Sequence, residues 1–339
     1  MRRAGLTLAV AVASACAPPP PSPGPPLAAP GLALSGDVSP VHDPTIVLEG
    51  GVAHLFSTTS QMREPPGLVH WRTSTDLLRW SPGGTVFPAL PAWAAAAVPG
   101  SKGIWAPDVA RAGDGFRLYY SVSTFGKNTS AIGLAVTKTL DRNDPRFGWV
   151  DEGLVIRSSP RDDFNAIDPD LLVDRTGRHW LSFGSFWSGL KLVEVDARTG
   201  RPAEARPRMY DLARRSPPGA IEAPEMVERN GRFYLFASVD FCCRGVDSTY
   251  STIVGRADSP TGPFVDAEGR PLLEGGGTTV LHADRDPTRR FVGPGHVTIF
   301  SAGETDYIAY HAYDREATGR PALRIQRIDW TPDGWPVAR

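Results

Sequence analysis

The sequence predicts an all-β protein, a five-bladed β-propeller with four-stranded antiparallel blades around a central channel. Two observations lead to this prediction. One short sequence pattern recurs five times along the chain, at a spacing of roughly 54 to 74 residues. Each copy carries strand and turn signals, and the chain shows no long helical period. Because repeats of this kind are typical of propeller blades, we expect one blade from each copy.

Each copy has the pattern of two strands joined by a tight turn. An apolar residue and an acid beside a proline come first, followed by a short apolar run, a Gly-containing turn and an aromatic strand that ends in Ser or Thr. The clearest copy is Asn165 to Gly189, NAIDPDLLVDRTGRHWLSFGSFWSG. The other four copies begin at His42, Ala106, Ala223 and Gly293.

One polar residue of each copy is expected at the start of an innermost strand, at one mouth of the channel. Carboxylates and an imidazole that face one cavity are costly unless they share protons, hydrogen-bond donors or a metal, so their convergence predicts a site. Taken alone, an Asp-Pro pair is a common start of a turn. The converging residues are Asp43, Asp108, Asp168, an acid at Glu222 or Glu225, and His296.

Composition and charge favour a single domain that binds an uncharged ligand. The chain has 339 residues with 35 Gly and 33 Pro, which suits many turns between short strands. We expect one propeller domain over residues 34–339. The net charge is −1 with acids and bases interspersed, which gives no electrostatic basis for binding nucleic acid. A neutral polymer or a small molecule fits better.

The N-terminus has the pattern of an export signal. Residues 1–16 contain two arginines, an apolar run too short to span a bilayer and then small residues. Cys16 follows Ala13, Ser14 and Ala15, which resembles the lipidation site of bacterial lipoproteins; ordinary cleavage is the alternative. Residues 17–33 are a proline-rich linker. We therefore expect an exported protein, either secreted or anchored by lipid at the bacterial cell surface.

Several other residues have both a structural and a functional interpretation. Trp105 stands just before the second converging position, where it would be either core or a surface on which a sugar ring stacks. Phe125 and Gly126 fall at a blade end, where loops carry contacts. His296 is either a satisfied polar residue or a ligand.

Cys242 and Cys243 are adjacent in FCCRGVDSTYS. Adjacent cysteines seldom bond to each other, because the ring would strain the peptide between them. The sequence therefore predicts no disulfide here, and two small residues packed in a loop, with a metal or redox role as the alternative.

The converging acids suit the hydrolysis of a glycosidic bond. That reaction needs one carboxylic acid to protonate the leaving oxygen and one carboxylate on the other side of the sugar. Asp43 and Glu222 belong to non-adjacent copies, so they can face each other across the axis. Asp168, from the copy between them, would raise the pKa of the proton donor through its like charge.

Motifs along most of the chain resemble the endo-1,5-α-L-arabinanases of glycoside hydrolase family 43. They are VHDP, GIWAPDV, YYSVSTFGKNTSAIGLA, NAIDPDL, WLSFGSFWSGLKL, AIEAP, FCCRG, STY, GPGH and YHAYD. The resemblance covers about residues 37 to 330. It implies a five-bladed propeller that hydrolyses α-1,5-linked arabinan, an arabinose polymer, with inversion at the anomeric carbon.

The resemblance also assigns roles to particular residues. Asp43 of VHDP would be the general base, Glu222 of IEAP the general acid, and Asp168 of AIDP the residue that tunes the pKa of Glu222 and positions substrate. His296 of GPGH matches a residue that holds a calcium ion in the channel, mostly through water; no organic cofactor is implied. The predicted substrate contacts are Asp43, Trp105, Phe125, Gly126, Asn165, Ala166, Ile167, Asp168, Ser185, Phe186 and Trp187.

Two positions depart from the family pattern. Glu225 stands where an aromatic residue usually follows EAP, and Val297 replaces the Asn that usually follows GPGH. Neither change removes one of the three acids.

Other functions remain open on the same scaffold. An exo-arabinanase, an α-L-arabinofuranosidase or a β-xylosidase would use the same acids, since endo and exo action differ by loops at one end of the groove. A non-catalytic carbohydrate-binding propeller is a remote alternative, because all three acids are present. The expected partners are linear arabinan and arabino-oligosaccharides, bound by a monomer that meets a membrane only through a possible lipid anchor.

Overall fold

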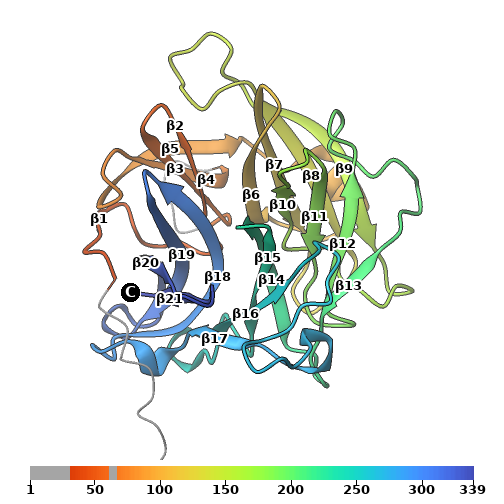
Figure 1. Ribbon diagram of the computed structural model, residues 1–339. Coiled ribbons are helices and arrows are strands. Elements are labelled where there is room, and N and C mark those ends of the chain that lie inside the picture. Colours follow the sequence, from red (N-terminus) through yellow and green to blue (C-terminus); the bar gives the residue numbers. More distant parts are fainter. Residues whose placement is uncertain (1–30, 61–66) are drawn as a thin grey trace, which may run out of the picture.

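The computed structural model describes residues 31–60 and 67–339 and confirms the five-bladed propeller (Figure 1). Every blade has four antiparallel strands, and blade one carries a short additional strand, β1 (Ser35–Gly36), which pairs in parallel with β5. The predicted signal peptide and most of the predicted linker lie outside the described residues. Within the described residues, no helix has the length and apolar character needed to cross a membrane.

Blades one to three contain thirteen strands and one short helix. Blade one is completed by β2 (Thr45–Glu49), β3 (Val52–Ser57), β4 (Leu68–Ser74) and β5 (Arg79–Phe87), and α1 (Ala92–Ala97) follows it. Blade two is β6 (Trp105–Ala112), β7 (Gly115–Val122), β8 (Ser130–Thr137) and β9 (Val150–Ser158). Blade three is β10 (Asp170–Val173), β11 (His179–Phe183), β12 (Leu190–Val195) and β13 (Tyr210–Ala213).

Blades four and five contain the other eight strands. Blade four is β14 (Ile221–Arg229), β15 (Arg232–Val239), β16 (Ser251–Ala257) and β17 (Thr278–Leu281). Blade five is β18 (Phe291–Ala302), β19 (Thr305–Asp314), β20 (Arg320–Trp330) and β21 (Pro336–Ala338). Four 3-10 turns lie in the connections: η1 (Gly245–Asp247), η2 (Leu272–Glu274), η3 (Ala283–Arg285) and η4 (Arg315–Ala317).

The first long strand of each blade is its innermost strand. Strands β2, β6, β10, β14 and β18 contact one another in that order, and β18 returns to β2. The start of every repeat is therefore placed at the axis, as the sequence predicts. The remaining strands of each blade extend outward from this ring (Figure 1).

The apolar core is divided among the interfaces between neighbouring blades. Five clusters of buried side chains each join two adjacent blades, and the cluster that joins blade five to blade one includes Leu55 and Ile325. Because each blade buries both of its faces, no blade can bury its apolar side chains alone.

Residues before the first blade close the ring. The Leu32 N–H donates to the Ile325 carbonyl at 2.8 Å, and the Leu323 N–H donates to the Val38 carbonyl at 2.9 Å. Leu32 also packs against the cluster that joins blades five and one. The contacts of the folded domain therefore reach into the last residues of the predicted linker.

The closing interface supplies a stability prediction. Leu55 is fully buried in it, so Leu55→Ala should lower the free energy of unfolding by about 3 kcal/mol through lost burial and a cavity. The matched control is Leu78→Ala, also in blade one, where the side chain is 42% exposed and the change should stay within about 0.5 kcal/mol. Urea unfolding measures both. Equal losses in the two variants would contradict the importance of this interface.

Candidate active site

Five residues with left-handed backbone form one ring at the starts of the innermost strands. Their φ angles lie between 41° and 57°, a region that side chains other than Gly seldom adopt. This ring, called the mouth ring below, contains Asp43, Ala106, Asp168, Ala223 and His296.

The mouth ring confirms three of the predicted positions and corrects the others. Asp43, Asp168 and His296 occupy equivalent places, but Ala106 rather than Asp108 represents blade two, and Ala223 represents blade four. Glu222 comes directly before Ala223. Asp108 and Glu225 each lie two residues further along their strands, because the acid of these copies follows the shared proline instead of preceding it.

Each mouth-ring residue is held by the blade before it. The Asp168 N–H donates to Ser121 Oγ at 2.9 Å, and the His296 N–H donates to Ser238 Oγ at 2.8 Å. The Asp43 N–H donates to His311 Nδ1 at 3.2 Å. Ala106 and Ala223 donate in the same way to Thr58 Oγ1 and Asp168 Oδ2. Neighbouring blades therefore fix the backbone from which the functional side chains project.

A second ring lies two residues further along each strand and joins the blades below the mouth. It contains Thr45, Asp108, Asp170, Glu225 and Thr298, and is called the inner ring below. In four of these residues a side-chain oxygen accepts from a backbone N–H of the next blade: Val109 to Thr45, Leu171 to Asp108, Met226 to Asp170, and Ile299 to Glu225, at 2.6 to 3.3 Å.

The inner-ring acids serve the structure as buried hydrogen-bond acceptors with raised pKa values. Burial raises the pKa of Asp108 to about 6 and the pKa of Asp170 to about 8. Burial, followed by the charges of Asp170 and Asp108, raises the pKa of Glu225 well above its usual range. None of the three lines the cleft described next. Glu225, where the family pattern has an aromatic residue, thus lies in the inner ring and does not line the cleft.

A cleft of about 1010 Å³ opens over the mouth ring. Phe125, 82% exposed, and Trp187, 42% exposed, stand at its wall. Of the predicted catalytic, substrate and metal residues, all but one line the cleft: Asp43, Trp105, Phe125, Gly126, Asn165, Ile167, Asp168, Ser185, Phe186, Trp187, Glu222 and His296.

Ala166 is the exception among the predicted contacts. Its side chain is fully buried and packs in the cluster between blades two and three. The neighbouring residues Asn165 and Ile167 do reach the cleft. Ala166 therefore supports the wall from behind instead of facing a ligand.

Asp43 is surrounded by groups that favour its charged form. Thr58 Oγ1 donates to Asp43 Oδ2 at 2.5 Å, and the Nδ1 atoms of His42 and His296 lie 2.9 and 3.1 Å from Oδ1. Burial alone would raise the pKa of Asp43, but the two imidazoles outweigh it and hold this pKa well below its usual range. The carboxylate is therefore ionised and ready to accept a proton.

Glu222 has the opposite character. Burial raises its pKa, although Ser185 Oγ donates to Glu222 Oε2 at 2.7 Å and Tyr250 also forms a hydrogen bond with it. Asp168 lies beside it and accepts the Ala223 N–H at 3.2 Å. Burial, and after it the charges of Glu222 and Asp43, raise the pKa of Asp168 well above its usual range. The charge of Glu222 thus favours the protonated form of Asp168.

His296 brings a positive charge to the same place. Burial would lower its pKa, but the charge and hydrogen bond of Asp43 raise the pKa of His296 to about 9. Val297, where the family pattern has Asn, is buried in the apolar cluster between blades four and five. At this position Val297 thus contributes apolar packing, where the Asn of the family pattern would contribute an amide group.

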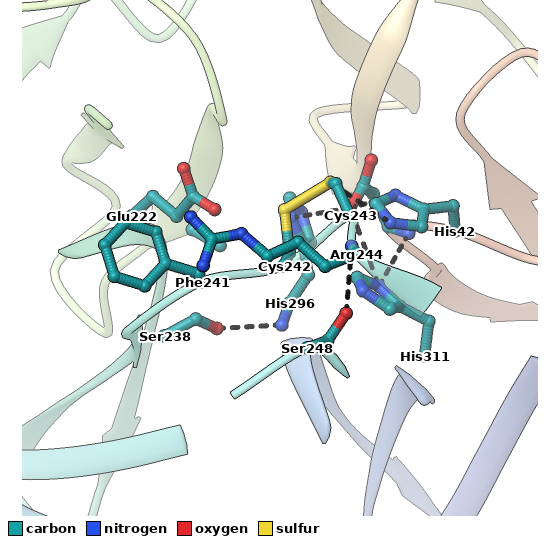
Figure 2. Close-up of a disulfide and its surroundings, with 12 residues drawn as sticks. His42, Glu222, Ser238, Phe241, Cys242, Cys243, Arg244, Ser248, His296 and His311 are labelled. Carbon is teal, nitrogen blue, oxygen red and sulfur yellow. Dashed lines mark hydrogen bonds and ion pairs between the residues drawn. A yellow bond between two sulfur atoms is a disulfide. The ribbon is translucent and has the colours of Figure 1, made fainter. Parts of the chain in front are cut away.

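The prediction of unbonded cysteines is wrong, since Cys242 and Cys243 form a disulfide. In an extended strand successive side chains point to opposite faces, but here the chain turns, with Cys243 at a φ of 67°. The disulfide lines the cleft between Glu222 and His42 (Figure 2). It is thus part of the site rather than a pair of packed loop residues.

Sequence reasoning also missed several side chains of the site. His42, Tyr250, Phe241 and Arg244 line the cleft, and Tyr313 bonds to His42 behind it. His42 and Tyr313 stand in the motifs VHDP and YHAYD, and the place of His42 directly before Asp43 was the available signal. Their partners come from other blades, which the repeat pattern does not pair.

Two carboxyl groups whose pKa values are shifted in opposite directions face one cleft walled by aromatic side chains. This arrangement supplies a base and an acid on a site suited to sugar rings, which defines a glycoside hydrolase. The sequence profile of glycosyl hydrolases family 43 matches residues 39–336. The chain belongs to this family.

Curated relatives extend over most of the chain. An extracellular endo-α-(1→5)-L-arabinanase of Bacillus subtilis is 41% identical over 298 residues, which cover 87% of each chain. An extracellular exo-α-(1→5)-L-arabinofuranosidase of Cellvibrio japonicus is 40% identical over 322 residues, covering 91% of this chain and 89% of the relative.

Solved structures of similar proteins have the same fold. The family 43 endo-arabinanase of Bacillus licheniformis is 41% identical, with a TM-score of 0.81 over 90% of this chain and 99% of the other. The α-L-arabinanase of Cellvibrio cellulosa complexed with arabinohexaose is 39% identical, with a TM-score of 0.81 over 88% and 95% of the two chains.

The inner ring supplies a prediction of pH dependence. The pKa of Asp170 is about 8, whereas an exposed Asp titrates near about 4, so the native protein holds a proton that the unfolded chain releases. The free energy of unfolding should therefore fall as the pH rises from about 4 to about 8. Asp170→Asn, which resembles the protonated acid in shape, should reduce this fall, as measured by urea unfolding at pH 5 and pH 8.

The control is the exposed Asp258, whose Asp258→Asn variant should keep the wild-type pH dependence. An unchanged pH dependence in Asp170→Asn would contradict a protonated Asp170 in the native protein.

Proposed function

We propose that the protein is an exported endo-acting arabinanase that hydrolyses α-1,5-L-arabinofuranosidic linkages with inversion. The observation that carries this proposal is the pairing in one cleft of Asp43, whose pKa is lowered, with Glu222, whose pKa is raised. The arabinanase names of the relatives supply the substrate, and the word extracellular in two of those names supports export. Lipid attachment at Cys16, and a monomeric state, remain parts of the proposal.

The proposed mechanism follows from the two opposite pKa shifts. Asp43 takes a proton from water, which attacks the anomeric carbon, while Glu222 gives its proton to the departing sugar oxygen. Asp168 accepts the N–H of Ala223, the residue next to Glu222, and so orients the acid; in its ionised form its like charge would also favour the protonated form of Glu222. Thr58 and His42 hold the Asp43 carboxylate in place.

Endo action is supported by the breadth of the cleft. Its aromatic walls come from blades two, three and four, with Phe125, Trp187 and Phe241 as examples. Such walls offer stacking surfaces for more than one sugar ring. The relative described as an exo-arabinofuranosidase keeps exo action as the second candidate.

We also propose a calcium ion near His296. Asp43, Asp168 and Glu222 converge there with one imidazole, so the donor set fits a hard cation by charge. Calcium takes about six to eight oxygen ligands, more than these side chains offer, so water would complete its shell. When bound, the ion would supply positive charge that lowers the pKa of nearby carboxyl groups.

The first experiment follows the digestion of debranched arabinan by the purified domain. Mixed short arabino-oligosaccharides during the first few per cent of conversion are expected from endo action. Asp43→Asn, Asp168→Asn and Glu222→Gln should each lower kcat/KM by at least about a thousandfold, because each removes a proton transfer or its control. The inner-ring variant Asp170→Asn is the matched control and should keep activity.

A single product from the start would instead indicate exo action. Activity only on aryl arabinosides or xylosides would leave the roles of the three acids intact but would contradict arabinan as the substrate. Near-normal turnover in any one of the three variants would contradict the role given to that residue.

Calcium is tested by removal and return. A chelator should lower the rate on arabinan and the melting temperature of the wild type, and added calcium should restore both, since a ligand that binds only the native state stabilises it. His296→Gln should lose the calcium-dependent rise in melting temperature. A wild type whose melting temperature ignores both chelator and calcium would overturn this part of the proposal.

A further inference from the structure

We propose that Tyr313 and His42 form a positioning relay that connects the Cys242–Cys243 disulfide turn to the carboxylate of Asp43. The inference rests on the proposed function, in which Asp43 is the base. The relay joins three blades: the turn belongs to blade four, Tyr313 to β19 of blade five, and His42 to the entry of blade one. Tyr313 and His42 are positioning residues, since they act through Asp43.

The relay is a continuous chain of short contacts. The Cys243 N–H donates to Tyr313 Oη at 2.7 Å. Tyr313 Oη lies 2.9 Å from His42 Nε2, and His42 Nδ1 lies 2.9 Å from Asp43 Oδ1. The Cys243 sulfur is itself 3.8 Å from His42 Nε2. The disulfide turn therefore reaches the base through only two side chains.

The direction of these hydrogen bonds fixes the tautomer of His42. Tyr313 Oη accepts from the Cys243 N–H and also bonds with Ser248, whose hydroxyl oxygen accepts the Arg244 N–H (Figure 2). An ionised carboxylate can only accept, so His42 Nδ1, 2.9 Å from Asp43 Oδ1, carries a proton and donates it to Asp43. In the neutral imidazole, Nε2 is then the acceptor of the Tyr313 hydroxyl proton.

His311 holds the other side of the same arrangement. Its ring is fully buried and stacks on His42, with ring centroids 3.8 Å apart and planes inclined by 22°. Its Nδ1 accepts the backbone N–H of Asp43. The backbone of the base is thus held by His311 and its carboxylate by His42, with the two imidazoles packed face to face.

The disulfide gives the first member of the relay a fixed position. The Cys243 N–H belongs to an exposed turn, which is closed by the Thr249 N–H to Phe241 carbonyl bond at 2.9 Å. Joining the two sulfurs across one peptide restricts the torsions of the residue that supplies the donor. Without this restriction Tyr313 would lose a partner, and its hydroxyl could rotate away from His42.

The experiment compares steady-state kinetics of two tyrosine variants on arabinan. Tyr313→Phe should lower kcat about 10- to 100-fold with little change in KM, because the base is misplaced while the sugar contacts remain. The matched control is Tyr310→Phe, which removes a buried hydroxyl bonded to Gln326 in the same strand, away from the cleft. Tyr310→Phe should keep the wild-type kcat.

Two further variants test the other members. His42→Asn keeps a donor near the position of Nδ1 and should retain much of the kcat that His42→Val loses. The double variant Cys242→Ser/Cys243→Ser should lower kcat in the same way as Tyr313→Phe. Combining it with Tyr313→Phe should lower kcat little further, because both changes break the same chain of hydrogen bonds.

Nitrogen-15 NMR of the histidine side chains gives a readout that does not need a substrate. The His42 signals, assigned by their absence in His42→Asn, should have the Nδ1-protonated pattern in the wild type and change in Tyr313→Phe. This readout separates the relay from the proposed function, which fails if the wild type does not cleave arabinan.

Three results would overturn the relay. The first is a wild-type kcat in folded Tyr313→Phe, and the second is a rise of KM alone, which would make these residues sugar contacts. The third is an Nε2-protonated His42 in the wild type.

Discussion

The site depends on hydrogen bonds that cross from one blade to the next around the channel. At each innermost strand, a residue with left-handed backbone gives its N–H to a side chain of the preceding blade. Two residues further along, a side chain accepts an N–H from the following blade. A left-handed residue costs free energy, about 1 kcal/mol or more for a side chain other than Gly. The bonds between blades over-determine this conformation and so allow it to persist.

This arrangement gives carboxyl groups of the same kind two different tasks. Asp168 and Asp170 are separated by one residue and both are buried with raised pKa values. Asp168 faces the cleft beside Glu222, whereas Asp170 accepts N–H and hydroxyl donors within the wall of the channel. A perturbed pKa therefore does not identify a catalytic acid here. Access to the cleft separates the two groups.

Electrostatic contrast across the cleft comes from the neighbours of each acid. Asp43 is surrounded by imidazoles and a hydroxyl donor, while Glu222 has another carboxyl group nearby. The first environment favours the charged form and the second the neutral form. An acid and a base can thus coexist at one pH.

The sequence was sufficient for the fold because turns and alternating strands repeat in every blade. It was also sufficient for Asp43 and Asp168, which precede the shared proline in HDP and IDP. The pattern predicts Asp108 as the mouth residue of blade two, and this is wrong because the acid follows that proline in APD. Aligning the prolines would have placed Ala106 there.

The disulfide and its relay could not be predicted in the same way. Whether Cys242 and Cys243 bond depends on the backbone of one turn, and Tyr313 meets that turn from a different blade. A repeat pattern predicts the features that all blades have in common, but it does not predict the side-chain contacts between two different blades. Ala166 illustrates the same limit, since its neighbours reach the cleft and it does not.

The central claim is that Asp43 acts on water while Glu222 protonates the leaving sugar. Proton NMR of the first products from an arabino-oligosaccharide, recorded before the anomers equilibrate, tests this claim most directly. The account predicts that the new reducing end appears first as the β-anomer, opposite to the α linkage that is cleaved. Initial release of the α-anomer would mean retention, and would contradict the base role of Asp43.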